Sequence, residues 1–170
     1  YWHFKDRQDL LDALLQDWEI RNHVEVASIR TRWEYDEPDL TDVAAIWLGE
    51  ERAFLDFDIA IRSWARKVRA VADVVWRVDS AWIGLLQDMF LAAGYDGNDA
   101  LVRARITYFH QIGYHALSFR EDRAERIALI PFYYRALTGR EPGKRLNSLI
   151  QRASSPAKDR KDRHQTPSPK

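Results

Sequence analysis

Between Val71 and Phe90, apolar side chains recur every three or four residues for about five turns of a helix. They are Val71, Val74, Val75, Val78, Trp82, Leu85, Leu86, Met89 and Phe90. This spacing places them on one face of an α-helix, and no segment shows the alternating pattern of a strand. Only seven glycines and six prolines occur in 170 residues, and four of the prolines lie after Arg140. We therefore expect an all-α protein, folded as a multi-helix bundle.

Other segments repeat the helical period, at residues 6–26, 41–54, 54–64, 101–117 and 122–137. Asp6 and Thr41 are side chains that cap helix N-termini, and Gly94 and Gly139 are suited to helix C-termini. Pro131 lies inside the last segment, so it should kink that helix or mark its true start.

Composition excludes several classes of protein. The chain has no cysteine, which rules out a disulfide framework, thiol chemistry and a zinc–thiolate site, and which suits a cytoplasmic protein. No apolar run approaches the roughly 18 residues that a membrane span needs. With 46% hydrophobic residues, the bulk of the chain should fold around a core.

Charge is distributed unevenly along the chain. Residues 140–170 carry a net charge of +6, whereas residues 1–139 carry −6. An acidic body is a poor nonspecific binder of phosphate backbone, so any DNA binding should come from a separate element near the first residues. We expect the basic segment 140–170 to be mostly disordered, with one short helical turn at Leu146, Leu149 and Ile150. It could touch nucleic acid, but solvated disorder is the commoner case.

The opening residues resemble part of a known family. Tyr1-Trp2-His3-Phe4-Lys5-Asp6-Arg7, followed by Leu10-Leu11, resembles the TetR-family junction between the recognition helix of the helix-turn-helix and the long helix after it. Stretches at 55–65, 71–95, 103–117 and 137–139 are similar to the regulatory domains of that family. The resemblance covers roughly residues 1–139.

The resemblance implies three parts. Residues 1–4 would be the end of a recognition helix, residues 5–139 a helical ligand-binding and dimerisation domain, and residues 140–170 a tail. The resemblance also implies a homodimeric transcriptional repressor that binds operator DNA and responds to a small apolar or aromatic effector. Most of the DNA-reading domain would lie outside this chain, so residues 1–170 alone should bind DNA weakly or not at all. The residues implied to lie near DNA are Tyr1, Trp2, His3, Lys5 and Arg7.

In this family the last two helices form a four-helix bundle between two subunits. The residues implied at that interface are Ile112, Gly113, Ala116, Ile130, Tyr134 and Leu137. Gly113 and Ala116, one turn apart, would let another helix approach closely, although packing within one subunit is nearly as good an explanation.

Aromatic side chains fall on the apolar faces of the expected helices and are candidates for an effector pocket, because such pockets are mostly apolar. They are Trp47, Phe54, Phe57, Trp64, Trp82, Phe90 and Phe109. For any one of them, ordinary core packing is the competing explanation.

Catalytic and metal patterns are weak in this sequence. His110 and His115 are five residues apart and point in different directions, so they do not form a chelating pair. Carboxylates at Glu50, Glu51, Asp56 and Asp58 fit solvated helix faces better than an acid–base pair. We therefore expect no enzymatic activity, metal or cofactor. The alternatives are an α-helical small-molecule-binding protein or enzyme without DNA function, and an interaction bundle with a filled core.

Overall fold

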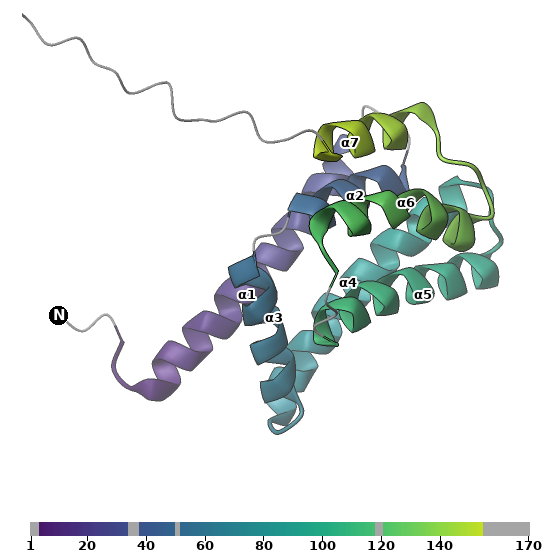
Figure 1. Ribbon diagram of the computed structural model, residues 1–170. Coiled ribbons are helices and arrows are strands. Elements are labelled where there is room, and N and C mark those ends of the chain that lie inside the picture. The colour runs from purple at the N-terminus through teal and green to yellow at the C-terminus, as the bar shows by residue number, and fades with distance from the viewer. Residues whose placement is uncertain (1–3, 34–37, 50–51, 118–120, 155–170) are drawn as a thin grey trace, which may run out of the picture. The chain divides into compact units, whose positions relative to one another are not determined.

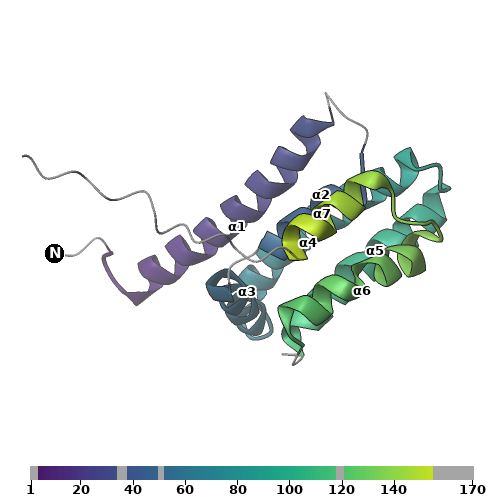
Figure 2. The ribbon, with the colours of Figure 1, turned by 45° about the horizontal axis from the view of Figure 1, so that its top comes forward.

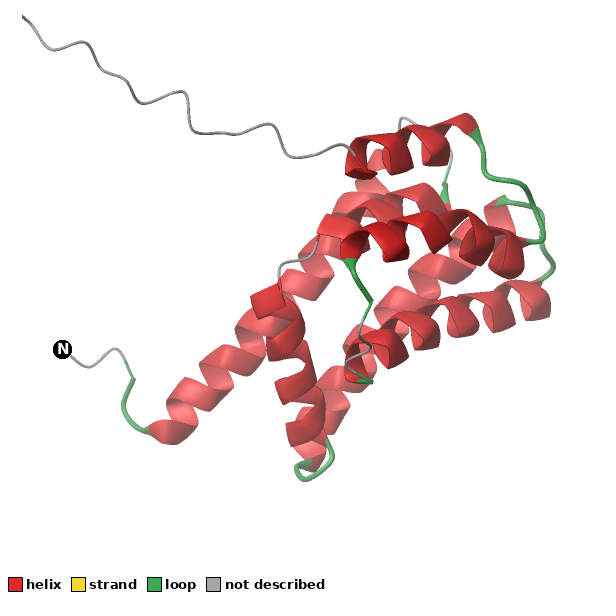
Figure 3. Ribbon diagram, viewed as in Figure 1, coloured by secondary structure: helices red, strands yellow, loops and turns green. Residues whose placement is uncertain are grey.

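The computed structural model describes residues 4–33, 38–49, 52–117 and 121–154. Every regular element in these ranges is a helix, which confirms the all-α prediction (Figure 3). The helices are α1 (Arg7–Arg32), α2 (Leu40–Gly49), α3 (Arg52–Ala65), α4 (Arg69–Ala92), α5 (Gly97–Ala116), α6 (Arg123–Thr138) and α7 (Lys144–Ser154). The chain forms two compact units, α1 to α5 and α6 with α7. The boundary between the two compact units lies before α6.

Local side chains set most helix ends. The carboxylate of Asp6 accepts a hydrogen bond from the backbone N–H of Asp9, so Asp6 caps α1 as predicted. Gly94 follows α4 with a φ of 89°, and Gly139 ends α6 with a φ of 66°. Both values lie in the left-handed region, where glycine has no steric penalty, and both C-terminal predictions are confirmed.

The predicted cap of α2 is wrong, and of the two alternatives predicted for Pro131 the structure excludes the helix start. Thr41 does not cap α2, because the helix begins at Leu40 and the Asp39 carboxylate accepts the Thr41 backbone N–H at 2.9 Å. Pro131 does not mark the start of α6, which runs unbroken from Arg123. The Asp122 side chain and Glu125 form a reciprocal capping box there, which satisfies the free N–H groups at the helix start.

The tail prediction also needs correction over residues 144–154. The structure forms α7 there, well beyond the one short turn that was expected. Its apolar side chains at Leu146, Leu149 and Ile150 lie on one helix face, and Leu146 is fully buried. Helix α7 packs against α6, and this tertiary contact stabilises it. The sequence of residues 140–170 by itself does not reveal that contact.

The first unit is built around α4, which packs against α1, α3 and α5 (Figures 1 and 2). The α4 stripe read from the sequence supplies the centre of the core, with Leu85, Leu86 and Phe90 fully buried. On α5 the core positions are Ala100, Ala104 and Tyr108, and the two alanines are small enough to allow a close approach to α4. The predicted α4 face is therefore the face that the fold buries.

Helix α1 lies alongside α4 and runs in the same direction. Three contacts follow one another in the same order along both helices. They are Glu19 with Arg77, Asn22 with Trp82, and Arg30 with Asp88. The first turns of α1 lie at the edge of the unit, where Leu10 and Leu14 remain exposed (Figure 1).

The second unit is a helical hairpin of α6 and α7. Ile127 and Leu146 are buried, and the Arg123 side chain donates to the backbone carbonyl of Ala153 at 2.7 Å. The opposite face of α6 leaves Leu129, Phe132 and Tyr133 exposed.

Candidate functional site

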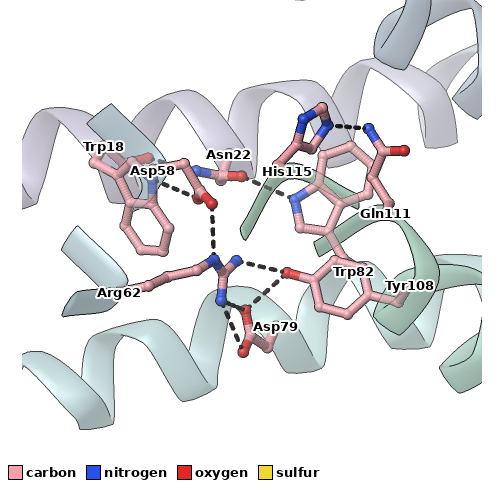
Figure 4. Close-up of polar contacts among 9 residues, drawn as sticks. All are labelled: Trp18, Asn22, Asp58, Arg62, Asp79, Trp82, Tyr108, Gln111 and His115. Atoms are coloured by element: carbon pink, nitrogen blue, oxygen red, sulfur yellow. Dashed lines mark hydrogen bonds and ion pairs between the residues drawn. The ribbon is translucent and has the colours of Figure 1, made fainter. Parts of the chain in front are cut away.

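Polar side chains converge in the otherwise apolar interior of the first unit (Figure 4). We call five of them the Arg62 cluster: Trp18 from α1, Asp58 and Arg62 from α3, Asp79 from α4 and Tyr108 from α5. Buried polar groups must find partners within the protein, so such a cluster holds its helices in a defined arrangement.

Arg62 is the centre of this cluster and uses all three guanidinium nitrogens. Nε donates to Asp58 Oδ2 at 2.8 Å, and Nη1 donates to Asp79 Oδ1 at 2.9 Å. Nη2 donates to the hydroxyl of Tyr108 at 3.0 Å. Asp58 lies one turn before Arg62 on α3, a spacing that brings the two side chains together on one helix face. The guanidinium thus joins α3 to α4 and α5.

Trp18 and Tyr108 complete the network from the core side, since both are almost fully buried. The Tyr108 hydroxyl donates to Asp79 Oδ1 at 2.7 Å, and the Trp18 indole N–H donates to Asp58 Oδ1 at 3.1 Å. The guanidinium carbon also lies 5.9 Å from the centre of the Trp18 ring, within the range of a cation–π contact. Trp18 therefore connects α1 to the cluster.

The electrostatics of the cluster favour a neutral tyrosine and a charged arginine. Burial raises the pKa of Tyr108 well above its ordinary value of about 10. Burial by itself lowers the pKa of Arg62, but Tyr108 and the two carboxylates outweigh it and raise that pKa. With two carboxylates around one guanidinium, the cluster has a formal charge of −1.

A second set of polar contacts lies beside the cluster. Asn22 on α1 donates to the backbone carbonyl of Trp18 at 2.9 Å and accepts the indole N–H of Trp82 on α4 at 2.9 Å. On α5, the Gln111 amide nitrogen lies 2.7 Å from Nε2 of His115, near Trp82 (Figure 4). The Asn22–Trp82 bond gives α1 a second polar attachment.

Removing the Tyr108 hydroxyl tests the electrostatics of the cluster. We expect Tyr108→Phe to lower the free energy of unfolding by about 1 to 2 kcal/mol at pH 7, because Arg62 and Asp79 each lose a partner. Since the folded state raises the pKa of Tyr108, its contribution is complete below pH 10 and is lost as the pH rises above about 10. The difference in unfolding free energy between wild type and Tyr108→Phe should therefore narrow in urea unfolding at pH 11. A difference that widens at pH 11 would contradict this account.

The candidate pocket residues occupy different environments. Trp82 and Phe90 are buried in the core, and Phe54, Phe57 and Trp64 pack against it while half-buried. Phe109 is 59% exposed and lies on the outer face of α5. The side chain of Trp47 lies outside the residues that the structure describes. Five of the seven candidates come from α3 and α4, the helices that also carry Asp58, Arg62 and Asp79.

The residues implied to lie near DNA are at or before the start of α1. Lys5 and Arg7 are exposed, and the Lys5 backbone N–H donates to the Asp9 carboxylate at 3.0 Å. Tyr1, Trp2 and His3 lie outside the described residues. Their role near DNA stays a prediction.

The residues implied at a dimer interface face several ways. Ile112 packs against the core of the first unit, Gly113 is half-buried and Ala116 is exposed. On α6, Ile130, Tyr134 and Leu137 are half-buried. The exposed apolar side chains of α5 are instead Val102, Ile106 and Phe109. Their spacing of four and three residues makes one apolar stripe along the outside of α5.

Sequence reasoning missed the cluster, and one prediction within it is wrong. Asp58 was assigned to a solvated face, but its side chain is only 16% exposed and is held by Arg62 and Trp18. Asp56 is exposed as expected, and Glu50 and Glu51 lie outside the described residues. The one available signal was the i, i+4 spacing of Asp58 and Arg62.

The Trp18 indole N–H, the Tyr108 hydroxyl and each guanidinium nitrogen of Arg62 donate to another member of the cluster. Among the described residues, no three His, Asp or Glu side chains are grouped so as to hold a metal ion. None of the described helices combines the length and apolar character needed to cross a bilayer.

A search with this chain found no matching protein-family model, no matching curated protein and no matching solved structure.

Proposed function

We propose that this chain is the regulatory core of a TetR-like transcriptional repressor. In this proposal it forms a homodimer, and a small apolar or aromatic effector binds in the helical core and controls DNA binding by a helix-turn-helix preceding α1. The effector acts through its different affinity for two arrangements of the dimer. In this proposal, helix α1 transmits the change in arrangement from the core to the DNA-reading head.

The observation that carries the proposal is the way α1 is attached. Its middle is joined to α3 through Trp18 and Asp58 and to α4 through Asn22 and Trp82. Its first turns extend to the edge of the unit. A long helix held at its middle and free at its start is suited to transmit a change in the core to an element attached at that start.

The start of α1 also presents an apolar surface that a preceding domain would cover. Phe4, Leu10 and Leu14 are each about two-fifths exposed. Leu10 and Leu14 lie one turn apart on the same face of α1, and exposed apolar side chains on one face favour contact with another folded element. This supports a DNA-reading head packed against the first turns of α1.

The aromatic side chains around α3 and α4 support an effector site in the core. Phe57 and Trp64 are half-buried on α3, the helix that also positions Arg62. Ligand sites in proteins combine apolar walls with a few polar groups of fixed orientation, and this region has both. An apolar or aromatic effector would suit such walls.

The exposed stripe of Val102, Ile106 and Phe109 supports the homodimer. Three large apolar side chains on one face of α5 are costly to leave in water, and two copies of a helix can bury such a stripe against each other. The interface would then use residues next to Gly113 rather than the core-facing Ile112.

The experiment that tests the proposal is selection of DNA by the protein translated from the complete gene. A library of random double-stranded DNA is presented at a fixed salt concentration, since affinity for DNA depends strongly on salt. A dimeric repressor should enrich a two-fold symmetric site with half-sites about one helical turn apart.

A further inference from the structure

We infer that Arg62 is a positioning residue that fixes the register of α1 against the rest of the first unit. It acts through Asp58, whose remaining oxygen accepts the Trp18 indole, and together with the Asn22–Trp82 bond it sets one longitudinal position for α1. The inference concerns α1 to α5 alone, and it holds whether or not the proposed function is correct.

The apolar contacts of α1 define its register less sharply than directed hydrogen bonds do. Its buried positions are Trp18, Asn22, Val26 and Ile29, and Leu15 packs partly against the same core. Apolar packing is non-directional, and a helix with apolar side chains on successive turns can slide by one turn of about 5.4 Å onto similar contacts. The polar contacts distinguish these positions.

A one-turn slide in either direction leaves a buried polar group without its partner. If α1 moves so that Leu14 or Leu15 faces α3, Asp58 Oδ1 loses the indole N–H that it now accepts. If α1 moves the opposite way, Val26 replaces Asn22 opposite Trp82, and the Trp82 indole N–H loses its acceptor. Only the observed register satisfies both indoles, and buried polar groups commonly fix helix register in this way.

Arg62 orients the carboxylate of Asp58 so that one of its oxygen atoms accepts from Trp18. The Arg62 Nε holds Oδ2 at 2.8 Å, so that Oδ1 faces Trp18. Arg62 is in turn held from α4 by Asp79 and from α5 by Tyr108. Three helices therefore combine to place one oxygen atom in front of one indole.

The exposed ion pairs between α1 and α4 do not provide the same selection. Glu19–Arg77 and Arg30–Asp88 have half-exposed arginines on long side chains that can follow a moving helix. Exposed pairs contribute little to stability. They serve as controls because they also attach α1 to the first unit, through α4 and with exposed side chains.

The test measures the position of α1 directly. Since the chain has no cysteine, Gln16→Cys on α1 and Arg105→Cys on α5, both exposed, would carry two spin labels at defined sites. Double electron–electron resonance then reports the distribution of distances between the labels. We expect one narrow distance in the otherwise unchanged protein.

Asp58→Leu and Arg62→Met are expected to add a second distance, displaced by at most about 5 Å for a one-turn slide. Asp58→Asn, which keeps an acceptor oxygen, should restore the single distance, and Arg77→Gln should leave it unchanged. Asp58→Leu leaves Arg62 paired with Asp79, so it provides a folded variant if Arg62→Met unfolds.

The inference would be overturned if folded Asp58→Leu or folded Arg62→Met kept the single distance of the parent. It would also be overturned if Arg77→Gln added a second distance as large as that of Asp58→Leu, because any α1 contact would then hold the register. Circular dichroism of each variant identifies the folded ones.

Discussion

Replacing Arg62 with methionine should lower the free energy of unfolding of the first unit by about 3 to 4 kcal/mol. The guanidinium is 19% exposed and is shared by Asp58 and Asp79, so its removal leaves two half-buried carboxylates facing each other without a cation. Removing one partner of a buried ion pair is far more costly than removing an exposed charge. The melting temperature should fall by roughly 6 to 12 °C.

Tryptophan fluorescence during urea unfolding is the appropriate measurement. All seven tryptophans lie within the first 82 residues, so their emission reports on α1 to α5 and not on the α6–α7 hairpin. Arg77→Met removes a half-exposed arginine of similar size and should cost about 1 kcal/mol or less. Equal losses in the two variants would show that the Arg62 cluster contributes no more than an exposed ion pair.

Replacing Phe109 with glutamate should convert a dimer into monomers at tens of micromolar protein. Phe109 is 59% exposed at the end of the α5 stripe with Val102 and Ile106. In a two-fold interface each substitution places a charge on both copies, and burying unpaired like charges is strongly unfavourable. Sedimentation equilibrium should give a dimer of the 20.0 kDa wild-type chain and a monomer for the variant.

Val24→Glu is the matched control for this dimer prediction. Val24 is 57% exposed, but it lies on α1, outside the α5 stripe. This variant should remain a dimer. A wild-type chain that sediments as a monomer at tens of micromolar, or a Phe109→Glu variant that stays dimeric, would contradict an α5-mediated dimer.

Features that depend on nearby residues could be predicted from the sequence. The buried face of α4 follows from its apolar period, and the ends at Asp6, Gly94 and Gly139 follow from single side chains and from glycine's access to positive φ. The predicted cap at Thr41 also rested on a single nearby side chain, and it was wrong. Asp39 lies two residues earlier and is as good a cap, so composition alone did not decide between them.

The Arg62 cluster could not be predicted, because its partners are distant in sequence. Arg62 lies 17 residues from Asp79 and 46 from Tyr108, and only the packing of α3, α4 and α5 brings them together. Trp18 lies 40 residues from Asp58. No local pattern encodes such contacts, so Asp58 was assigned to solvent.

The outer face of α5 was ambiguous for a different reason. This helix has apolar side chains on both faces, so its period does not say which face meets α4. The structure buries Ala100, Ala104 and Tyr108 and leaves Val102 and Phe109 outside. Ala100 and Ala104 are small enough for a close contact with α4, whereas Val102 and Phe109 remain exposed and available for a partner.

The repressor proposal is tested most directly by the affinity of the complete gene product for its selected DNA, compared with that of residues 1–170 alone. We predict that the complete protein binds a two-fold symmetric site with a Kd of about 10⁻⁸ M or tighter at physiological salt. Residues 1–170, whose first 139 residues have a net charge of −6, should show no specific binding to the same DNA. A complete protein that enriches no DNA sequence, or a 1–170 chain that binds the selected site equally well, would contradict the account.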